Sequence, residues 1–205
     1  MIRTLFLPGA GGSAGFWRPV AERLALEGVF LSWPGLGEEP PEPGVAGIAD
    51  LVTLALAEVT APVNIVAQSM GGYIALKLAL ARPDLVNRLV LCVTSGGVPV
   101  GDLGGSDWRT DYFAAYPSAA RWIGDPVEDL SPRLGAVRAP ALLLWGDADP
   151  ISPVAVGRRL HALLPDARLH ILHGADHDLA RTFPDAVAGE IRRHLCGTGT
   201  PLSAR

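Results

Sequence analysis

Five side chains with the chemistry of a nucleophile, an acid or a base stand directly after apolar runs of this 205-residue sequence. They are one serine, Ser69, two acids, Asp147 and Asp149, and two histidines, His173 and His177. A serine hydroxyl is a poor nucleophile until a base removes its proton. Histidine titrates close enough to neutrality to take that proton and return it, and a carboxylate can fix the imidazole tautomer. The set therefore suits nucleophilic catalysis, provided that the fold brings its members together.

Ser69 lies in the sequence AQSMGG, residues 67–72, between an apolar run and a helical pattern. A sharp turn from strand to helix would hold this serine in a strained backbone conformation with its hydroxyl exposed. The small residues around it would let strand and helix approach closely. The N–H of Met70, at the start of the helix, would then be placed to donate to an oxyanion. The alternative is that Ser69 only caps the helix and that the glycines serve packing.

Short apolar runs alternate along the chain with longer stretches of helical spacing, which predicts a parallel sheet in an α/β domain. The runs are mostly continuous rather than alternating in polarity, as expected for strands that helices cover on both faces. Ligands of such sheets bind beyond the carboxyl ends of the strands, where the five side chains stand. The predicted strands begin at residues 3, 29, 63, 86, 139 and 167, and the predicted helices lie within 15–28, 48–59, 71–83, 153–165 and 183–195.

The chain resembles the α/β-hydrolase superfamily from LFLPGAGGSAGFW near its start to PDAVAGEIRRHL near its end. In this superfamily a serine on a strand-to-helix turn, the nucleophile elbow, is followed in chain order by an acid and then a histidine. The acid usually follows its strand as G-x-x-D, which corresponds to residues 146–149 and implies Asp149. The histidine usually follows the last strand as G-x-x-H or G-H, which implies His177. The resemblance thus implies a catalytic triad of these two residues and Ser69.

The acid has one close alternative, because Asp147 follows the same apolar run and could serve in its place. The other acids and histidines nearby are expected in structural roles. We expect loop and helix-cap positions for Asp176 and Asp178, and positions within or at the end of a strand for His170 and His173.

A second oxyanion donor is implied by the resemblance in the loop after the first strand, which here reads PGAGG over residues 8–12. The match points to the backbone N–H of Ala10. Relatives often carry a histidine where this chain has Pro8, so the support of the loop is expected to differ. A phosphate-binding loop is the alternative, but the segment lacks the Lys-Ser/Thr of a P-loop and the spacing of a dinucleotide fingerprint.

The irregular interval 96–138 is expected to form a small cap, part of which is the crossover between strands. We expect an α/β-hydrolase fold with about six mostly parallel strands and helices on both faces. Because the sequence begins directly at the strand that precedes the predicted oxyanion loop, we also expect a reduced N-terminus. One domain is expected over residues 1–196 and a flexible tail over 197–205. We predict that four aromatic residues line the substrate pocket: Trp17, Trp33, Trp108 and Tyr112. The alternative is that these side chains only pack the cap against the rest of the domain.

Composition narrows the classes of partner. Hydrophobic residues are 49% of the chain, charged residues are 19%, and the formal net charge is −4. A globular protein is expected, with no nucleic acid or membrane as partner. Cys92 and Cys196 are too far apart to suggest a disulfide framework or zinc site, and we expect no metal or cofactor. No signal-peptide core and no bilayer-spanning segment is evident, so a cytoplasmic protein is expected.

The resemblance implies a serine hydrolase that cleaves small carboxylic esters through an acyl-enzyme. A thioesterase, or a C–C hydrolase or lyase, could use the same triad. The alternative of another class is a non-catalytic protein of the same fold that binds a small molecule.

Overall fold

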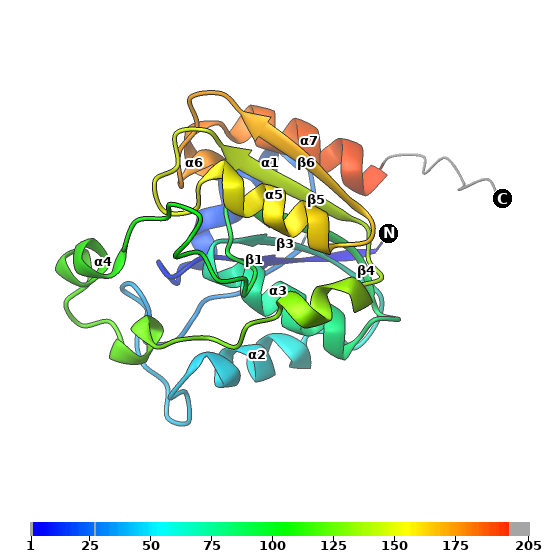
Figure 1. The fold of residues 1–205 in the computed structure, drawn as a ribbon. Helices are drawn as coiled ribbons and strands as arrows, with labels where there is room; N and C mark the ends of the chain where they lie inside the picture. Colours follow the sequence, from blue (N-terminus) through cyan, green and yellow to red (C-terminus); the bar gives the residue numbers. More distant parts are fainter. Residues whose placement is uncertain (1, 27, 197–205) are drawn as a thin grey trace, which may run out of the picture.

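Six strands form one sheet in the part of the chain that the computed structural model describes, residues 2–26 and 28–196. The strands are β1 Arg3–Leu7, β2 Gly28–Phe30, β3 Val63–Gln68, β4 Val86–Cys92, β5 Ala141–Gly146 and β6 Ala167–Leu172. All are parallel, in the order β2-β1-β3-β4-β5-β6 (Figure 1). Each predicted strand is present and the predicted α/β class is confirmed. The tail predicted over 197–205 lies outside the described residues.

The inner strands are buried along almost their whole length. β3 and β5 bury all six of their residues, whereas the edge strand β6 is partly exposed throughout. The continuous apolar runs of the inner strands follow from this, because a strand covered on both faces has no side that favours polar residues. The buried inner strands therefore form a rigid sheet, and the turn after β3 lies at the carboxyl edge of this sheet.

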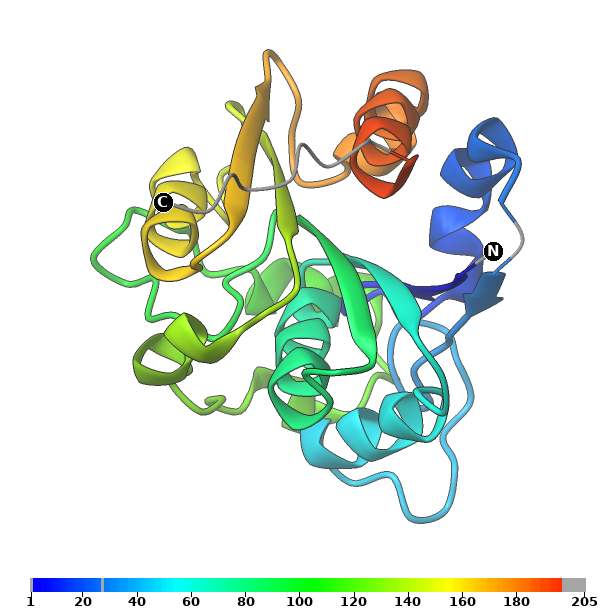
Figure 2. The ribbon, with the colours of Figure 1, turned by 90° about the vertical axis from the view of Figure 1, so that its right-hand side faces the viewer.

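Two layers of helices cover the sheet. The helices are α1 Arg18–Leu24, α2 Ile48–Ala57, α3 Met70–Ala81, α5 Val154–Leu163, α6 Leu179–Thr182 and α7 Pro184–Cys196. Figures 1 and 2 show α1, α6 and α7 on one face and α2, α3 and α5 on the other. Five of these six helices were predicted, whereas the four-residue α6 was not. No helix within the described residues is both long and apolar enough to cross a membrane.

The connection from β4 to β5 holds the segment predicted as a cap. It contains α4 Arg109–Ala115 and two 3₁₀ helices, Arg121–Gly124 and Ser131–Ala136. α4 lies toward the edge of the sheet at which the strand arrows end (Figure 1), and none of its residues is fully buried. The segment therefore lies near the carboxyl ends of the strands without contributing a core of its own.

Candidate active site

Ser69 stands in the turn that joins β3 to α3, with φ 51° and ψ −123°. Residues with a side chain avoid such positive φ values, and holding one there costs about 1–3 kcal/mol. The turn is crowded, because a Cβ on Gly71 would lie 2.4 Å from the carbonyl oxygen of Pro8. A Cβ on Gly72 would lie 2.5 Å from the hydroxyl oxygen of Thr94. The small residues after Ser69 are therefore required by the close approach of two neighbouring segments.

The hydroxyl of Ser69 does not cap α3. Its side chain makes no capping hydrogen bond, and its Oγ lies 2.9 Å from Nε2 of His177. The helix-cap alternative for this serine is therefore wrong. The first N–H groups of α3, which have no partner within the helix, present the positive end of the helix dipole to the turn.

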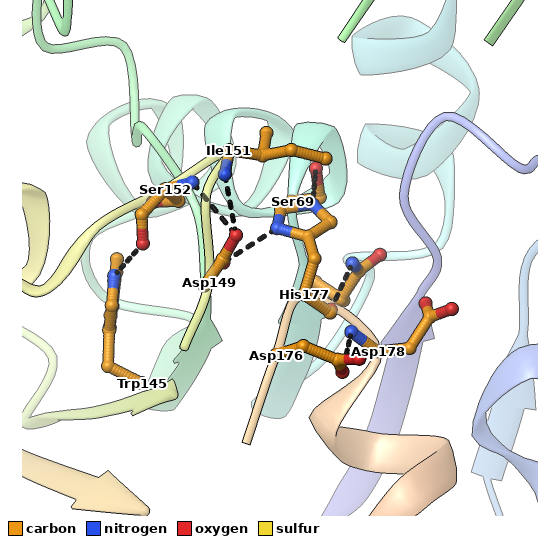
Figure 3. Close-up of polar contacts among 9 residues, drawn as sticks. Ser69, Trp145, Asp149, Ile151, Ser152, Asp176, His177 and Asp178 are labelled. Carbon is orange, nitrogen blue, oxygen red and sulfur yellow. Dashed lines mark hydrogen bonds and ion pairs between the residues drawn. The ribbon is translucent and has the colours of Figure 1, made fainter. Parts of the chain in front are cut away.

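A continuous chain of hydrogen bonds leads from Ser69 through His177 to Asp149 (Figure 3). Nδ1 of His177 lies 2.8 Å from Oδ2 of Asp149, and the other carboxylate oxygen accepts the N–H groups of Ile151 at 2.8 Å and Ser152 at 3.1 Å. The Asp149 side chain is 0% exposed and that of His177 is 19% exposed. A buried carboxylate with both oxygens satisfied suits an imidazole that carries its proton on Nδ1 and turns the lone pair of Nε2 toward the serine.

The loop after β5 is shaped to present Asp149. The indole N–H of Trp145 donates to the carbonyl oxygen of Ser152 at 2.8 Å, which closes the loop around the carboxylate (Figure 3). A Cβ on Gly146 would lie 2.1 Å from the carbonyl oxygen of Ala175. The loops that carry the acid and the histidine thus touch backbone to backbone, which fixes their separation.

Asp147, the alternative acid, binds a different histidine. Its Oδ2 lies 2.7 Å from Nδ1 of His173, and its Oδ1 accepts the N–H of Gly174 at 2.7 Å. The hydrogen bond between the two side chains lowers the pKa of Asp147 and raises the pKa of His173. The His173 side chain is 98% exposed, so this pair faces solvent. The structure brings Asp149 to His177 and leaves Asp147 outside.

Other polar residues near the histidine contact the backbone. Asp176 accepts the N–H of Asp178 at 3.0 Å before α6, and His170 lies within β6, as predicted. Gln68 was not singled out from the sequence, although it adjoins the serine; its side-chain amide donates to the carbonyl oxygen of His177 at 3.3 Å. No group of three or more potential metal ligands occurs within residues 2–26 and 28–196.

The predicted oxyanion donors lie on two segments that meet at Ser69. Met70 is the first residue of α3. Ala10 belongs to the oxyanion loop, residues 8–12, and follows Gly9, whose Cβ would lie 3.0 Å from the Cβ of Ser69. Among the loop and turn hydrogen bonds of the described residues, neither the Ala10 N–H nor the Met70 N–H is a donor. The role of these two groups as oxyanion donors stays a prediction.

Two of the four aromatic residues predicted to line a pocket lie in the core instead. Trp17 and Trp33 are buried, with indole N–H groups that donate to the carbonyl oxygens of Leu7 at 2.9 Å and Pro8 at 2.8 Å. A side chain without accessible surface cannot contact a substrate, so the prediction is corrected for these two. They support the end of β1 and the start of the oxyanion loop.

The other two aromatic residues belong to the cap segment. The rings of Trp108 and Tyr112 meet edge to face with centroids 5.4 Å apart, and both are partly exposed. The Tyr112 hydroxyl donates to the carbonyl oxygen of Ala10 at 2.8 Å and accepts the N–H of Gly37 at 3.0 Å. A pocket role stays a prediction for Trp108, whereas the hydroxyl of Tyr112 is engaged by backbone.

Comparison with known proteins agrees with this fold. A family model described as "Alpha/beta hydrolase family" matches residues 4–135, and one described as "TAP-like protein" matches residues 108–202. The uncharacterized hydrolase YugF of Bacillus subtilis is 27% identical over an alignment of 171 positions, which covers 62% of this chain and 63% of that protein. The chain thus spans less than two thirds of that relative's length.

A second relative is 2-hydroxy-6-oxononadienedioate/2-hydroxy-6-oxononatrienedioate hydrolase 1 of Dechloromonas aromatica. It is 28% identical over an alignment of 223 positions, gaps included, which covers 83% of this chain and 77% of that protein. Among solved structures, a thermophilic esterase from Thermogutta terrifontis superposes with a TM-score of 0.76 at 21% identity, covering 96% of this chain and 90% of that one. The match over residues 4–135, together with the six-stranded fold, shows that the chain belongs to the alpha/beta hydrolase family, and its relatives are hydrolases.

Proposed function

We propose that this chain is a serine hydrolase in which Ser69, His177 and Asp149 form the catalytic triad. The observation that carries the proposal is the hydrogen-bond chain from the serine hydroxyl to a buried carboxylate, with links of 2.9 and 2.8 Å. The strained backbone of Ser69 supports it, because strain of this kind clusters at active sites. A protein that only bound a small molecule would need neither the strain nor the buried acid behind the histidine.

The geometry supports acyl transfer in two steps. Ser69 Oγ attacks the carbonyl carbon while His177 Nε2 takes the hydroxyl proton, and the N–H groups of Ala10 and Met70 stabilise the oxyanion. His177 then gives the proton to the leaving alkoxide, and an alcohol departs from the acyl-enzyme. Water attacks the acyl carbonyl as His177 accepts one of its protons. As this intermediate collapses, His177 returns the proton to Ser69 Oγ, which releases the carboxylic acid and restores the serine hydroxyl.

The proposed substrate is a small, uncharged carboxylic ester. Two arginines of the cap segment, Arg109 on α4 and Arg121, contact other residues of that segment, which supports an acyl group without a carboxylate. Arg109 donates to the carbonyl oxygen of Gly124 and to the carboxylate of Asp107, both at 3.0 Å. The guanidinium of Arg121 lies 4.4 Å from the ring centroid of Phe113.

A second candidate is hydrolysis of a C–C bond next to a carbonyl group, by the same triad. The observation that favours it is the 28% identity to the hydrolase of Dechloromonas aromatica, whose name specifies an oxo-dienedioate. A dianionic substrate of this kind would need cationic partners near Ser69. Such a role would require the cap arginines to leave their present contacts, so the ester remains the first candidate.

The experiment pairs a fluorophosphonate probe with p-nitrophenyl butyrate, comparing the wild type with Ser69→Ala. The matched control is Ser95→Ala, because Ser95 also follows a strand but its Oγ accepts the N–H of Gly97. We expect labelling and turnover in the wild type and in Ser95→Ala, and neither in Ser69→Ala. Absence of labelling and of Ser69-dependent turnover in the wild type would overturn the proposal.

The substrate class is determined by comparing kcat/KM for a panel of substrates under the same conditions. It contains acetyl to octanoyl esters, the butyryl thioester of N-acetylcysteamine and a 2-hydroxy-6-oxo-dienoate. The highest kcat/KM is expected for a short ester. A dienoate that is turned over at least tenfold more efficiently than every ester would establish the second candidate in its place.

A further inference from the structure

The oxyanion loop is held by its carbonyl oxygens. Three consecutive carbonyls of this loop accept hydrogen bonds, and the three donors come from different parts of the chain. The pairs are Trp33 Nε1 to Pro8 O at 2.8 Å, Gly12 N to Gly9 O at 3.1 Å, and Tyr112 Oη to Ala10 O at 2.8 Å. Three successive peptide planes are thereby fixed around the predicted donor residue.

The orientation of the Ala10 N–H follows from these bonds. The N–H of Ala10 and the carbonyl of Gly9 share one trans peptide group, in which the two bonds point in opposite directions. The next peptide group carries the carbonyl of Ala10 itself, which Tyr112 holds. Since the backbone has only two soft dihedrals per residue, anchoring both flanking planes defines the conformation of Ala10.

Tyr112 differs from the other two donors because it belongs to the cap segment. Its hydroxyl lies where the oxyanion loop meets the segment after β2, since it also accepts the N–H of Gly37 at 3.0 Å. These two segments touch: a Cβ on Gly37 would lie 2.1 Å from the carbonyl oxygen of Gly11. One hydroxyl therefore joins α4 to the oxyanion loop, which lies beside Ser69, and to the segment after β2.

The ring of Tyr112 is fixed by its aromatic neighbours. The centroids of Trp108, Phe113 and Tyr116 lie 5.4, 5.3 and 5.2 Å from its own. Aromatic contacts at such distances restrict the ring, so the hydroxyl is held in place before any ligand binds. The same cluster provides a control, because the hydroxyl of Tyr116 makes no hydrogen bond within the described residues.

We propose that Tyr112 is a positioning residue, whose hydroxyl holds the Ala10–Gly11 peptide so that the N–H of Ala10 faces the oxyanion. The inference rests on the proposed function, and it gives the cap a part in stabilising the transition state. Tyr112 contacts neither the substrate nor the reacting atoms in this role; it acts through Ala10.

The test compares Tyr112→Phe with Tyr116→Phe, each of which removes one hydroxyl and leaves its ring. Loss of a neutral hydrogen bond typically changes an equilibrium or a rate by a factor of about 2–13. We therefore expect kcat for p-nitrophenyl butyrate to fall about 2- to 13-fold in Tyr112→Phe, with KM within about twofold of the wild type. Affinity for a trifluoromethyl ketone, whose adduct with Ser69 carries an oxyanion, should fall by the same factor. Tyr116→Phe should change neither quantity more than about twofold.

A structural readout is independent of activity. The N–H of Gly37 donates to the Tyr112 hydroxyl, so its hydrogen exchange should accelerate in Tyr112→Phe and not in Tyr116→Phe. Equal kcat values in the two variants, or a change confined to KM, would overturn the inference while leaving the proposed function intact. A wild type without Ser69-dependent turnover would overturn the proposed function, and this inference with it.

Discussion

Asp147 and Asp149 stand two residues apart after β5, yet their carboxylates bind different histidines. Asp149 is buried and lies 2.8 Å from Nδ1 of His177, whereas Asp147 lies at the surface, 2.7 Å from Nδ1 of His173. One short loop thus contains two carboxylate–histidine pairs of similar length in opposite surroundings. Only the buried pair continues to the hydroxyl of Ser69.

This difference predicts unequal effects for the same substitution at the two positions. Asp149→Asn should lower kcat for an ester about 10³- to 10⁴-fold, because an amide there favours the imidazole tautomer that cannot accept the serine proton. Asp147→Asn should stay within about threefold of the wild type. Steady-state kinetics on p-nitrophenyl butyrate checks both, and the reverse ranking would show that the acid has been assigned to the wrong residue.

The exposed pair predicts a pH dependence of stability. Because the pKa of His173 is raised on folding, its protonated form stabilises the folded state. This stabilisation is complete below the pKa of the unfolded state, about 6.5, and is lost as pH rises through the pKa of the folded state. Because the pKa of Asp147 is lowered on folding, its ionised form stabilises the folded state. This stabilisation is present above the pKa of the unfolded state, about 3.9, and is lost as pH falls through the pKa of the folded state. The pair therefore stabilises the fold most between about pH 4 and pH 6.5.

Thermal unfolding of His173→Gln beside the wild type tests this dependence. The difference between their midpoint temperatures of unfolding should be largest near pH 5.5 and should disappear at alkaline pH. It should be small at every pH because the pair is exposed. His161→Gln is the control, since His161 is an exposed histidine on α5. A difference that is the same at every pH would contradict the prediction.

The strands, the long helices and the candidate triad could be predicted because each leaves a local signal. Ser69 is flanked by small residues, and the acid and histidine follow apolar runs in the expected order. The helix α6 has four residues, too few to show a helical period. Trp17 and Trp33 could not be placed in advance, because an indole suits a pocket wall or a core equally well until its N–H has a partner. The bond from Tyr112 to Ala10 spans 102 residues, and no pattern within either segment reveals it.

The crowding at the turn from β3 to α3 predicts an effect of a substitution at Gly71 on stability. An added Cβ would lie 2.4 and 2.8 Å from the carbonyl oxygens of Pro8 and Leu7, which are backbone atoms and cannot turn away. Gly71→Ala should therefore lower the free energy of unfolding by about 1–3 kcal/mol. Gly135→Ala is the control, because a Cβ there would meet nothing within 4 Å. Urea unfolding of both variants measures the difference, and equal stability would show that the turn can widen.

The two tryptophans Trp33 and Trp108 predict opposite responses to the same substitution. Trp33→Phe removes the N–H that binds the carbonyl oxygen of Pro8 and leaves that oxygen buried without its donor, which costs about 1–3 kcal/mol of unfolding free energy. Trp108 lies partly exposed in the cap, and its indole N–H makes no hydrogen bond within the described residues. Trp108→Phe should therefore change stability by less than about 1 kcal/mol, and it should raise KM for aryl esters if the residue lines the pocket. Urea unfolding and KM are measured for both variants. A rise in KM without loss of stability in Trp33→Phe would show that Trp33 lines the substrate pocket after all. A core residue that holds the oxyanion loop should instead lose stability when it is substituted, without a rise in KM.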